Sequence, residues 1–225
     1  MHSSCDRAKF AHKCVLSRML DAFVEAVSPG GNLILPAFSY TFCNGEVFDP
    51  DETPSTVGIM TEQFRKSPGV KRSDDGIFSI AVLGSDQDYF IDVGRDCFGA
   101  QSVFEKLYDR NAWLVFIGET FDMTYIHFIE QRLRVPYRSK KRFSGVIRKG
   151  CCLINAVFEY NVRPLDQGIH YDLEKIARYL EDAGLLRISA LGHSKIRAVH
   201  CVDAFNLLSA ALRKDIYFFL KAPLR

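Results

Sequence analysis

Three polar side chains in the stretch FDMTYIHFIEQR, residues 121–132, have types and a spacing that suit acid–base chemistry. Thr124, His127 and Glu130 follow one another at intervals of three, which lines side chains along one side of a helix. An imidazole titrates near neutrality, so His127 can take a proton from a reacting group. The stretch follows the apolar run 113–118, which predicts a buried strand, and α/β proteins often gather catalytic groups where a strand leads into a helix.

Each of these residues also has a simpler structural role. Thr124 can cap the helix, and Glu130 can either hold the tautomer of the imidazole or pair with Arg134 four residues later. A metal-dependent hydrolase that uses His127 and Glu130 is a weaker alternative, because no further ligands follow at metal-binding spacing. The sequence therefore predicts no metal site.

The composition excludes several classes of protein. The 225 residues are 48% hydrophobic and carry a net charge of +2, which does not suit a partner as negatively charged as nucleic acid. No apolar run approaches the ~20 residues that span a bilayer, and the first ten residues contain no signal-peptide core. The seven cysteines have no metal-ligand spacing and are expected to be reduced. We therefore expect a cytoplasmic protein with neither nucleic-acid nor membrane partners.

Hydrophobic periodicity predicts alternating helices and strands in the first part of the chain and strands after Pro136. The predicted helices are 9–27, 56–65, 104–108, 124–133, 172–183 and 204–212. The predicted strands are 32–38, 78–84, 113–118, 143–147, 152–158 and 160–163, with one or two more in 184–202. The pattern indicates the α/β class: one three-layer α/β/α domain over residues 1–225, with a β-rich insertion in its C-terminal half.

Five segments, in this order, resemble the aminoglycoside 3-N-acetyltransferase family, also called the antibiotic N-acetyltransferase family. They are HSS at 2–4 with GGNLILPAFS at 30–39, FDPDETPSTVGIMTEQFRKSPGVKRS at 48–73, IFSIAVLG at 77–84, CFGAQSVFEKL at 97–107, and the stretch at 121–132. Because the matches keep their order over most of residues 2–138, they carry more weight than any single motif.

The resemblance implies an acetyl-CoA-dependent N-acetyltransferase that acts on an amino group of an aminosugar or aminoglycoside. In such a reaction His127 is the general base for direct attack on the thioester, and Glu130 and Thr124 belong to the catalytic site. The implied contacts to CoA are His2, Ser3, Ser4, Arg72, Ser73 and Ser79. Acetyl transfer also needs donors for the developing oxyanion and a cradle for the CoA phosphates.

Several of these assignments have structural alternatives. Ser3 and Ser4 can cap a helix, Arg72 can belong to a solvated basic turn, and Ser79 can be a small core residue. Glu62 can attract a cationic aminosugar, or it can form a salt bridge with the basic residues that follow it.

The acceptor is open between two kinds of amine. The segments 135–147 and 159–165 resemble family members associated with bacterial surface polysaccharides. The basic cluster, defined as Arg138, Lys140, Lys141 and Arg142, suits an anionic acceptor such as a nucleotide-linked aminosugar, although such a loop can also be merely solvated.

Two features depart from the family pattern. Asp75 and Gly76 stand where His-Pro is usual, and only Met1 precedes HSS, where the family has a strand. We therefore expect a chain that begins late or lacks an edge strand. This leaves as an alternative a catalytically impaired relative that only binds CoA or a sugar. A homodimer is the expected assembly.

Overall fold

The computed structural model describes residues 2–3, 13–164 and 169–222. Within these ranges the helices are α1 (Lys13–Val27), α2 (Ile59–Arg65), α3 (Gln87–Ile91), α4 (Val103–Asp109), α5 (Ile126–Leu133), α6 (Leu173–Asp182), α7 (Cys201–Lys214) and the 3₁₀ helix η1 (Thr41–Asn44). The strands are β1 (His2–Ser3), β2 (Asn32–Pro36), β3 (Lys71–Arg72), β4 (Ile80–Gly84), β5 (Trp113–Ile117), β6 (Ser139–Lys149), β7 (Cys152–Val162), β8 (Arg187–Leu191) and β9 (Ser194–His200).

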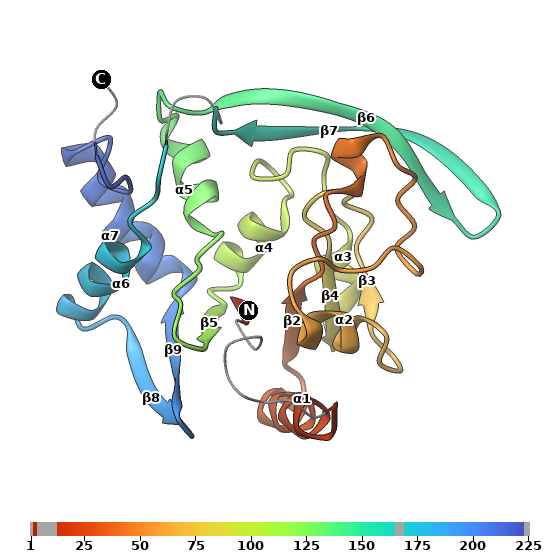
Figure 1. Ribbon diagram of the computed structural model, residues 1–225, viewed down its shortest axis with the longest axis horizontal. Coiled ribbons are helices and arrows are strands. Elements are labelled where there is room, and N and C mark those ends of the chain that lie inside the picture. Colours follow the sequence, from red (N-terminus) through yellow and green to blue (C-terminus); the bar gives the residue numbers. More distant parts are fainter. Residues whose placement is uncertain (1, 4–12, 165–168, 223–225) are drawn as a thin grey trace.

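The first sheet has the strand order β1-β5-β9-β8 and carries the start of the candidate site. β1 runs parallel to β5, with His2 beside Phe116, and β9 runs antiparallel to β5 on its other side. Leu114 and Phe116 of β5 point into the hydrophobic core. β5 therefore holds the loop that leads to α5 at a fixed place in the sheet (Figure 1).

The second sheet, β2-β4-β3, is antiparallel. β2 ends at Pro36, two residues before the predicted end at 38, since proline has no N–H to continue a ladder. Residues from β2, β4 and β5 line one common cavity, so this sheet adjoins the first.

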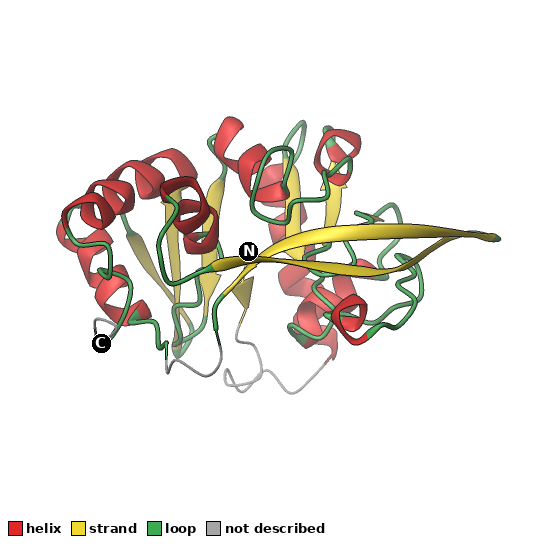
Figure 2. Ribbon diagram, turned by 90° about the horizontal axis from the view of Figure 1, so that it is seen from above, coloured by secondary structure: helices red, strands yellow, loops and turns green. Residues whose placement is uncertain are grey.

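The β-rich insertion is a single long hairpin. β6 and β7 pair antiparallel from Ser139 opposite Val162 to Lys149 opposite Cys152, and the hairpin extends beyond the rest of the molecule (Figures 1 and 2). The prediction of two separate strands in 152–163 is wrong, because Glu159 stays in register opposite Arg142 and β7 is continuous.

The mixed α/β class is confirmed, and most predicted elements are present with shifted ends. Sequence patterns missed β1, α3, β3 and η1, which are each five residues or shorter. α5 begins at Ile126 instead of Thr124. The three-layer arrangement and the single domain stay predictions.

Candidate active site

His127 lies in the first turn of α5 against two charged side chains. Its Nδ1 is 2.8 Å from Oε2 of Glu130, one turn further on the same helix. Nη1 of Arg138 donates to the same oxygen at 2.5 Å and also contacts Nδ1 of His127. The hydroxyl of Tyr171 adds a fourth group, donating to this oxygen at 3.1 Å. One carboxylate oxygen therefore gathers an imidazole, a guanidinium and a phenol.

This cluster is withdrawn from solvent, and its charges are balanced inside it. The side chains of Glu130 and Arg138 are 0% and 1% exposed, whereas that of His127 is 19% exposed. Burial lowers the pKa of His127, and the charge of Arg138 lowers it further. Burial alone would raise the pKa of Glu130, but the contacts with His127 and Arg138 outweigh it and lower that pKa. Glu130 is therefore an anion paired with Arg138, and the imidazole is neutral.

The contact with Glu130 favours the tautomer of His127 that carries its one ring proton on Nδ1. When Nδ1–H donates to Glu130, the lone pair of the ring is left on Nε2. A neutral, oriented imidazole with a free Nε2 is the arrangement that a general base requires.

Local structure before and after α5 holds this arrangement in place. Gly118 has a φ of 111°, which favours glycine, and lets the chain turn out of β5. Nη2 of Arg197 donates to the carbonyls of Gly118 and Glu119 at 3.1 and 2.6 Å, fixing the loop before the helix. After the helix, Arg134 adopts a left-handed conformation that ends α5, and the chain then returns through Arg138 into β6.

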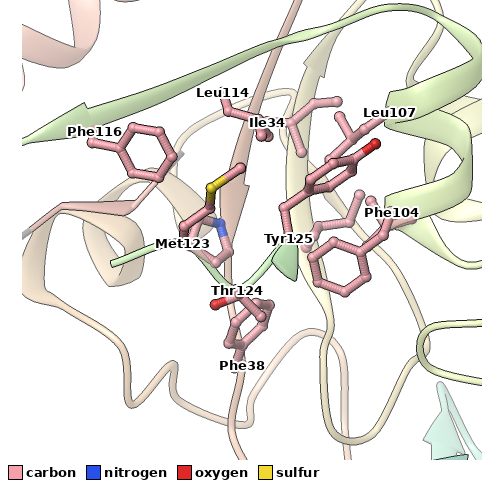
Figure 3. Close-up of a pocket in the computed structure, with 12 residues that line it drawn as sticks. Ile34, Phe38, Phe104, Leu107, Leu114, Phe116, Met123, Thr124 and Tyr125 are labelled. Atoms are coloured by element: carbon pink, nitrogen blue, oxygen red, sulfur yellow. The ribbon is translucent and has the colours of Figure 1, made fainter. Parts of the chain in front are cut away.

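Thr124 does not cap α5 with its side chain. The N-cap position is Tyr125, without a side-chain hydrogen bond, and Thr124 contributes only its carbonyl, which accepts from the His127 N–H at 3.0 Å. Thr124 lines a cavity of about 40 Å³ whose other walls are almost entirely apolar, including Phe38, Phe104 and Met123 (Figure 3). Thr124 thus adds a polar side chain to an apolar cavity three residues before His127, and its role in a catalytic site stays a prediction.

Two of the three N-terminal residues predicted to contact CoA lie within the described ranges. His2 and Ser3 form β1, in register with Phe116 and Ile117 at the end of β5 that leads to α5. Ser4 lies outside the described residues. The backbone of β1 thus runs beside the strand that carries the candidate site.

Arg72, Ser73 and Ser79 are brought together as a buried bridge between strands. The guanidinium of Arg72 donates to the Ala37 carbonyl at 2.5 Å and to the Ser79 hydroxyl at 3.1 Å, and it also contacts the carbonyl of Thr53. Ser73 and Ser79 are 1% and 0% exposed. These contacts tie the loop after β2 to β3 and β4, and a contact with CoA phosphates stays a prediction for all three.

Glu62 forms the salt bridges that were its structural alternative. Its Oε1 lies 2.7 Å from Arg65 and 2.8 Å from Lys66, and Oε2 accepts from the Ser55 N–H at 2.8 Å. Burial opposes ionisation, but these hydrogen bonds hold the pKa of Glu62 at about 2. The structure does not bring Glu62 into contact with His127, and its contact with an acceptor stays a prediction.

The basic cluster is largely neutralised. Arg138 is buried against Glu130, and Nζ of Lys140 lies 2.7 Å from Asp96 and 3.0 Å from Glu159. Arg142 lies 4.0 Å from Glu159. Sequence reasoning placed Arg138 in a solvated or acceptor-binding loop and missed its contact with the His127–Glu130 pair, which no sequence pattern signals.

Asp75, which replaces the histidine of the family pattern, has a local structural role. Its Oδ1 accepts from the N–H groups of Ile77 and Phe78 at 2.8 and 2.9 Å, which shapes the turn before β4. Burial raises the pKa of Asp75 to about 6. The departure from the family pattern is therefore accommodated within the fold.

The part of the chain that the structure describes contains no cluster of three or more side chains able to hold a metal ion. Nor does any described helix combine the length and apolar character needed to cross a bilayer.

The family model for aminoglycoside 3-N-acetyltransferases matches residues 1–213 of the chain. The chain belongs to that family. The curated relatives of this family member include aminoglycoside N(3)-acetyltransferase IV from Salmonella, 24% identical over 210 residues that cover 91% of this chain and 77% of the relative. They also include the SPbeta prophage-derived aminoglycoside N(3')-acetyltransferase-like protein YokD of Bacillus subtilis, 26% identical over 60% of this chain and 56% of that protein.

Solved structures of aminoglycoside acetyltransferases share the fold. The apoenzyme of aminoglycoside acetyltransferase AAC(3)-IVa superposes with a TM-score of 0.78 at 22% identity, covering 99% of this chain and 83% of that one. A binary complex of AAC-IIIb with CoASH gives a TM-score of 0.78 at 20% identity, covering 92% and 85%. AAC-VIa bound to sisomicin gives 0.76 at 18% identity, covering 90% and 85%.

Proposed function

We propose that this member of the family transfers the acetyl group of acetyl-CoA to an amino group of an aminosugar or aminoglycoside. The observation that carries the proposal is the buried His127–Glu130–Arg138 cluster, with Nε2 of the imidazole free. The proposal is also supported by relatives of the same fold that have been solved with CoA or with an aminoglycoside.

Acetyl-CoA supplies an acyl group activated as a thioester. The acceptor nitrogen bonds to the acyl carbon while the carbon–sulfur bond breaks, and Nε2 of His127 takes a proton from the nitrogen. CoA leaves as the thiolate, which then takes a proton from the imidazolium. The protein therefore moves one proton and keeps no covalent bond to either substrate.

Glu130 and Arg138 act through His127. Glu130 fixes the tautomer and favours the imidazolium that forms during transfer, whereas Arg138 neutralises the carboxylate when the imidazole is neutral. In this proposal the hydroxyl of Thr124, which lines the apolar cavity, donates to the acyl carbonyl.

Release of free thiol from acetyl-CoA, measured over a panel of aminosugars and aminoglycosides, tests the proposal. We expect His127→Ala to reduce the rate by roughly 10²–10⁴-fold, as the loss of a general base does, with CoA affinity little changed. His193→Ala, at an exposed histidine outside the cluster, is the matched control. Wild-type protein that binds CoA but releases no thiol with any amine would establish the impaired relative instead. A cytoplasmic location and a homodimer stay predictions.

A further inference from the structure

A continuous aromatic cluster connects His127 to two partly exposed tyrosines. The His127 ring lies edge-on to Phe98 at 5.5 Å, and Phe98 packs on Phe78 at 4.8 Å. Tyr40 packs edge-on to Phe78 at 5.7 Å, and Tyr160 lies 4.9 Å from Phe78 and 5.7 Å from Phe98. Phe78 and Phe98 are buried, so the surface of this cluster is formed by the two tyrosines and by His127.

Tyr40 is held in an uncommon conformation. Its φ of 59° and ψ of 1° are left-handed, which a bulky aromatic residue rarely adopts. Its neighbours Phe38 and Phe42 are buried, whereas Tyr40 is 39% exposed. The left-handed turn therefore directs the ring of Tyr40 toward solvent, whereas Phe38 and Phe42 on either side pack in the core. Such strain persists where the surroundings enforce it and is concentrated at ligand sites.

Most carboxylates around this aromatic surface are already paired with a lysine or an arginine. Asp96 and Glu159 are occupied by Lys140, and Asp74 is occupied by Arg95 and Lys149. Those acids are therefore already neutralised by cations of the same chain.

Asp122 is the carboxylate that remains for a ligand. It is exposed, lies two residues before Thr124, and has no ion pair within the described ranges. Burial, Tyr160 and the charge of Asp122 together raise the pKa of Tyr40, so Asp122 lies within electrostatic range of Tyr40.

Two cations also face this surface. Lys141 is paired in register with Tyr160 across the hairpin, and its Nζ lies over the Phe143 ring, 4.9 Å from the centroid. Arg163 lies over Tyr171, the ring that packs on His127. One available acid beside two cations does not complement a ligand with four or five ammonium groups.

We propose that Tyr40 and Tyr160 form the binding surface for the sugar ring of an acceptor with a single amino group, that Asp122 attracts its ammonium group, and that Lys141 disfavours polycationic acceptors. This inference rests on the proposed function and names its acceptor class. Ligand sites combine aromatic walls with a few placed polar groups, and aromatic faces also attract ammonium groups.

The test compares glucosamine with an aminoglycoside that carries at least four amino groups. We expect wild type to have the higher kcat/KM for glucosamine. Tyr40→Gly accepts the left-handed backbone and removes the ring, and it should raise the KM for glucosamine by about tenfold, the loss of one good aromatic contact. Tyr40→Phe keeps the ring and should restore most of that affinity.

Two neighbouring lysines on opposite faces of β6 provide a test variant and its matched control. Lys141→Ala should lower the KM for the aminoglycoside, whereas Lys140→Ala, which frees Asp96 and Glu159 on the other face, should have the smaller effect.

The outcomes separate this inference from the proposed function. Thiol release that favours the aminoglycoside, or a KM for glucosamine that Tyr40→Gly leaves unchanged, would overturn the acceptor class and keep the transferase. If wild type releases no thiol with any amine, calorimetric measurement of glucosamine binding decides whether the aromatic surface still binds a sugar. Binding that is lost in Tyr40→Gly would support the surface and refute the transferase, and no binding at all would refute both.

Discussion

Arg138 sets the electrostatics of His127 by direct contact. Its positive charge, added to burial, keeps the pKa of His127 below the ordinary value of about 6.5. Removing that charge should raise the pKa of His127. We therefore expect Arg138→Met to move the acid limb of the kcat/KM profile to higher pH, because protonation of the free enzyme's base defines that limb.

The same substitution leaves Glu130 as an uncompensated buried charge and should destabilise the fold by about 3–5 kcal/mol. The double variant Arg138→Met with Glu130→Gln removes both charges and should recover part of that loss. Arg134→Met, at an exposed arginine four residues earlier, is the control. An acid limb that stays in place in Arg138→Met would exclude the electrostatic role.

Asp75 makes stability depend on pH in a definite direction. Its pKa in the folded state is about 6, above the ordinary 3.8, so the folded state holds the proton more tightly than the unfolded state does. Its contribution to stability is complete below pH 3.8 and is lost as pH rises through 6. The cost of ionising the buried group is about 3 kcal/mol, from 1.36 kcal/mol for each unit of pKa.

Asp75→Asn keeps an oxygen that can accept from Ile77 and Phe78 but cannot ionise. We expect this variant to be more stable than wild type above pH 6 and to lose the advantage toward pH 4, as followed by urea unfolding at several pH values. Parallel pH profiles for the two proteins would contradict a raised pKa.

At the scale of elements, the β6–β7 hairpin packs closely against η1 at Gly145. A Cβ at Gly145 would lie 2.9 Å from Cζ of Phe42, a ring that is 1% exposed and packed edge-on to Phe158. Because neither ring has room to move, Gly145→Ala should cost about 1–3 kcal/mol and lower the Tm. Ser144→Ala, at the exposed neighbouring position, should leave the Tm nearly unchanged.

Sequence patterns can predict contacts within one helix but not contacts between a helix and a distant hairpin. The contact between His127 and Glu130 follows from helix periodicity alone, whereas Thr124 lies before the first turn of α5. The contact of Arg138 with Glu130 depends on a left-handed turn at Arg134 and on the pairing of two long strands. Such non-local geometry leaves no periodic trace in the sequence.

The partners of polar side chains in strands are harder to predict from the sequence than those of side chains in helices. The sequence predicts Arg72 in a basic turn. Its guanidinium instead donates hydrogen bonds to Ala37 and Ser79, which lie on other segments. Glu62 was easier, because its partners Arg65 and Lys66 are within one helical turn. Sequence analysis thus predicted the local partners of Glu62 but missed the partners of Arg72, which lie on other segments.

At the scale of the whole molecule, binding of acetyl-CoA should be visible without turnover. A ligand that binds only the folded state stabilises it by about 2.7 kcal/mol at a concentration of 100 times its Kd. We expect acetyl-CoA to raise the Tm of wild type and of His127→Ala equally. In Ser3→Ala with Ser4→Ala the increase should be smaller, and an equal increase would restrict those serines to a structural role.

The distribution of thiols bears on how the assembly of this protein is measured. Among the cysteines that the structure describes, Cys97 and Cys201 are buried and Cys43 is half-buried, whereas Cys151 and Cys152 are exposed where β6 turns into β7. Burial raises the pKa of Cys43 to about 11 and that of Cys201 to about 12, so these two thiols stay protonated and slow to oxidise. Air oxidation at Cys151 or Cys152 would join two molecules tip to tip through the hairpin, and a dimer that dithiothreitol and the double variant Cys151→Ser with Cys152→Ser both abolish would be a product of storage instead of the native assembly.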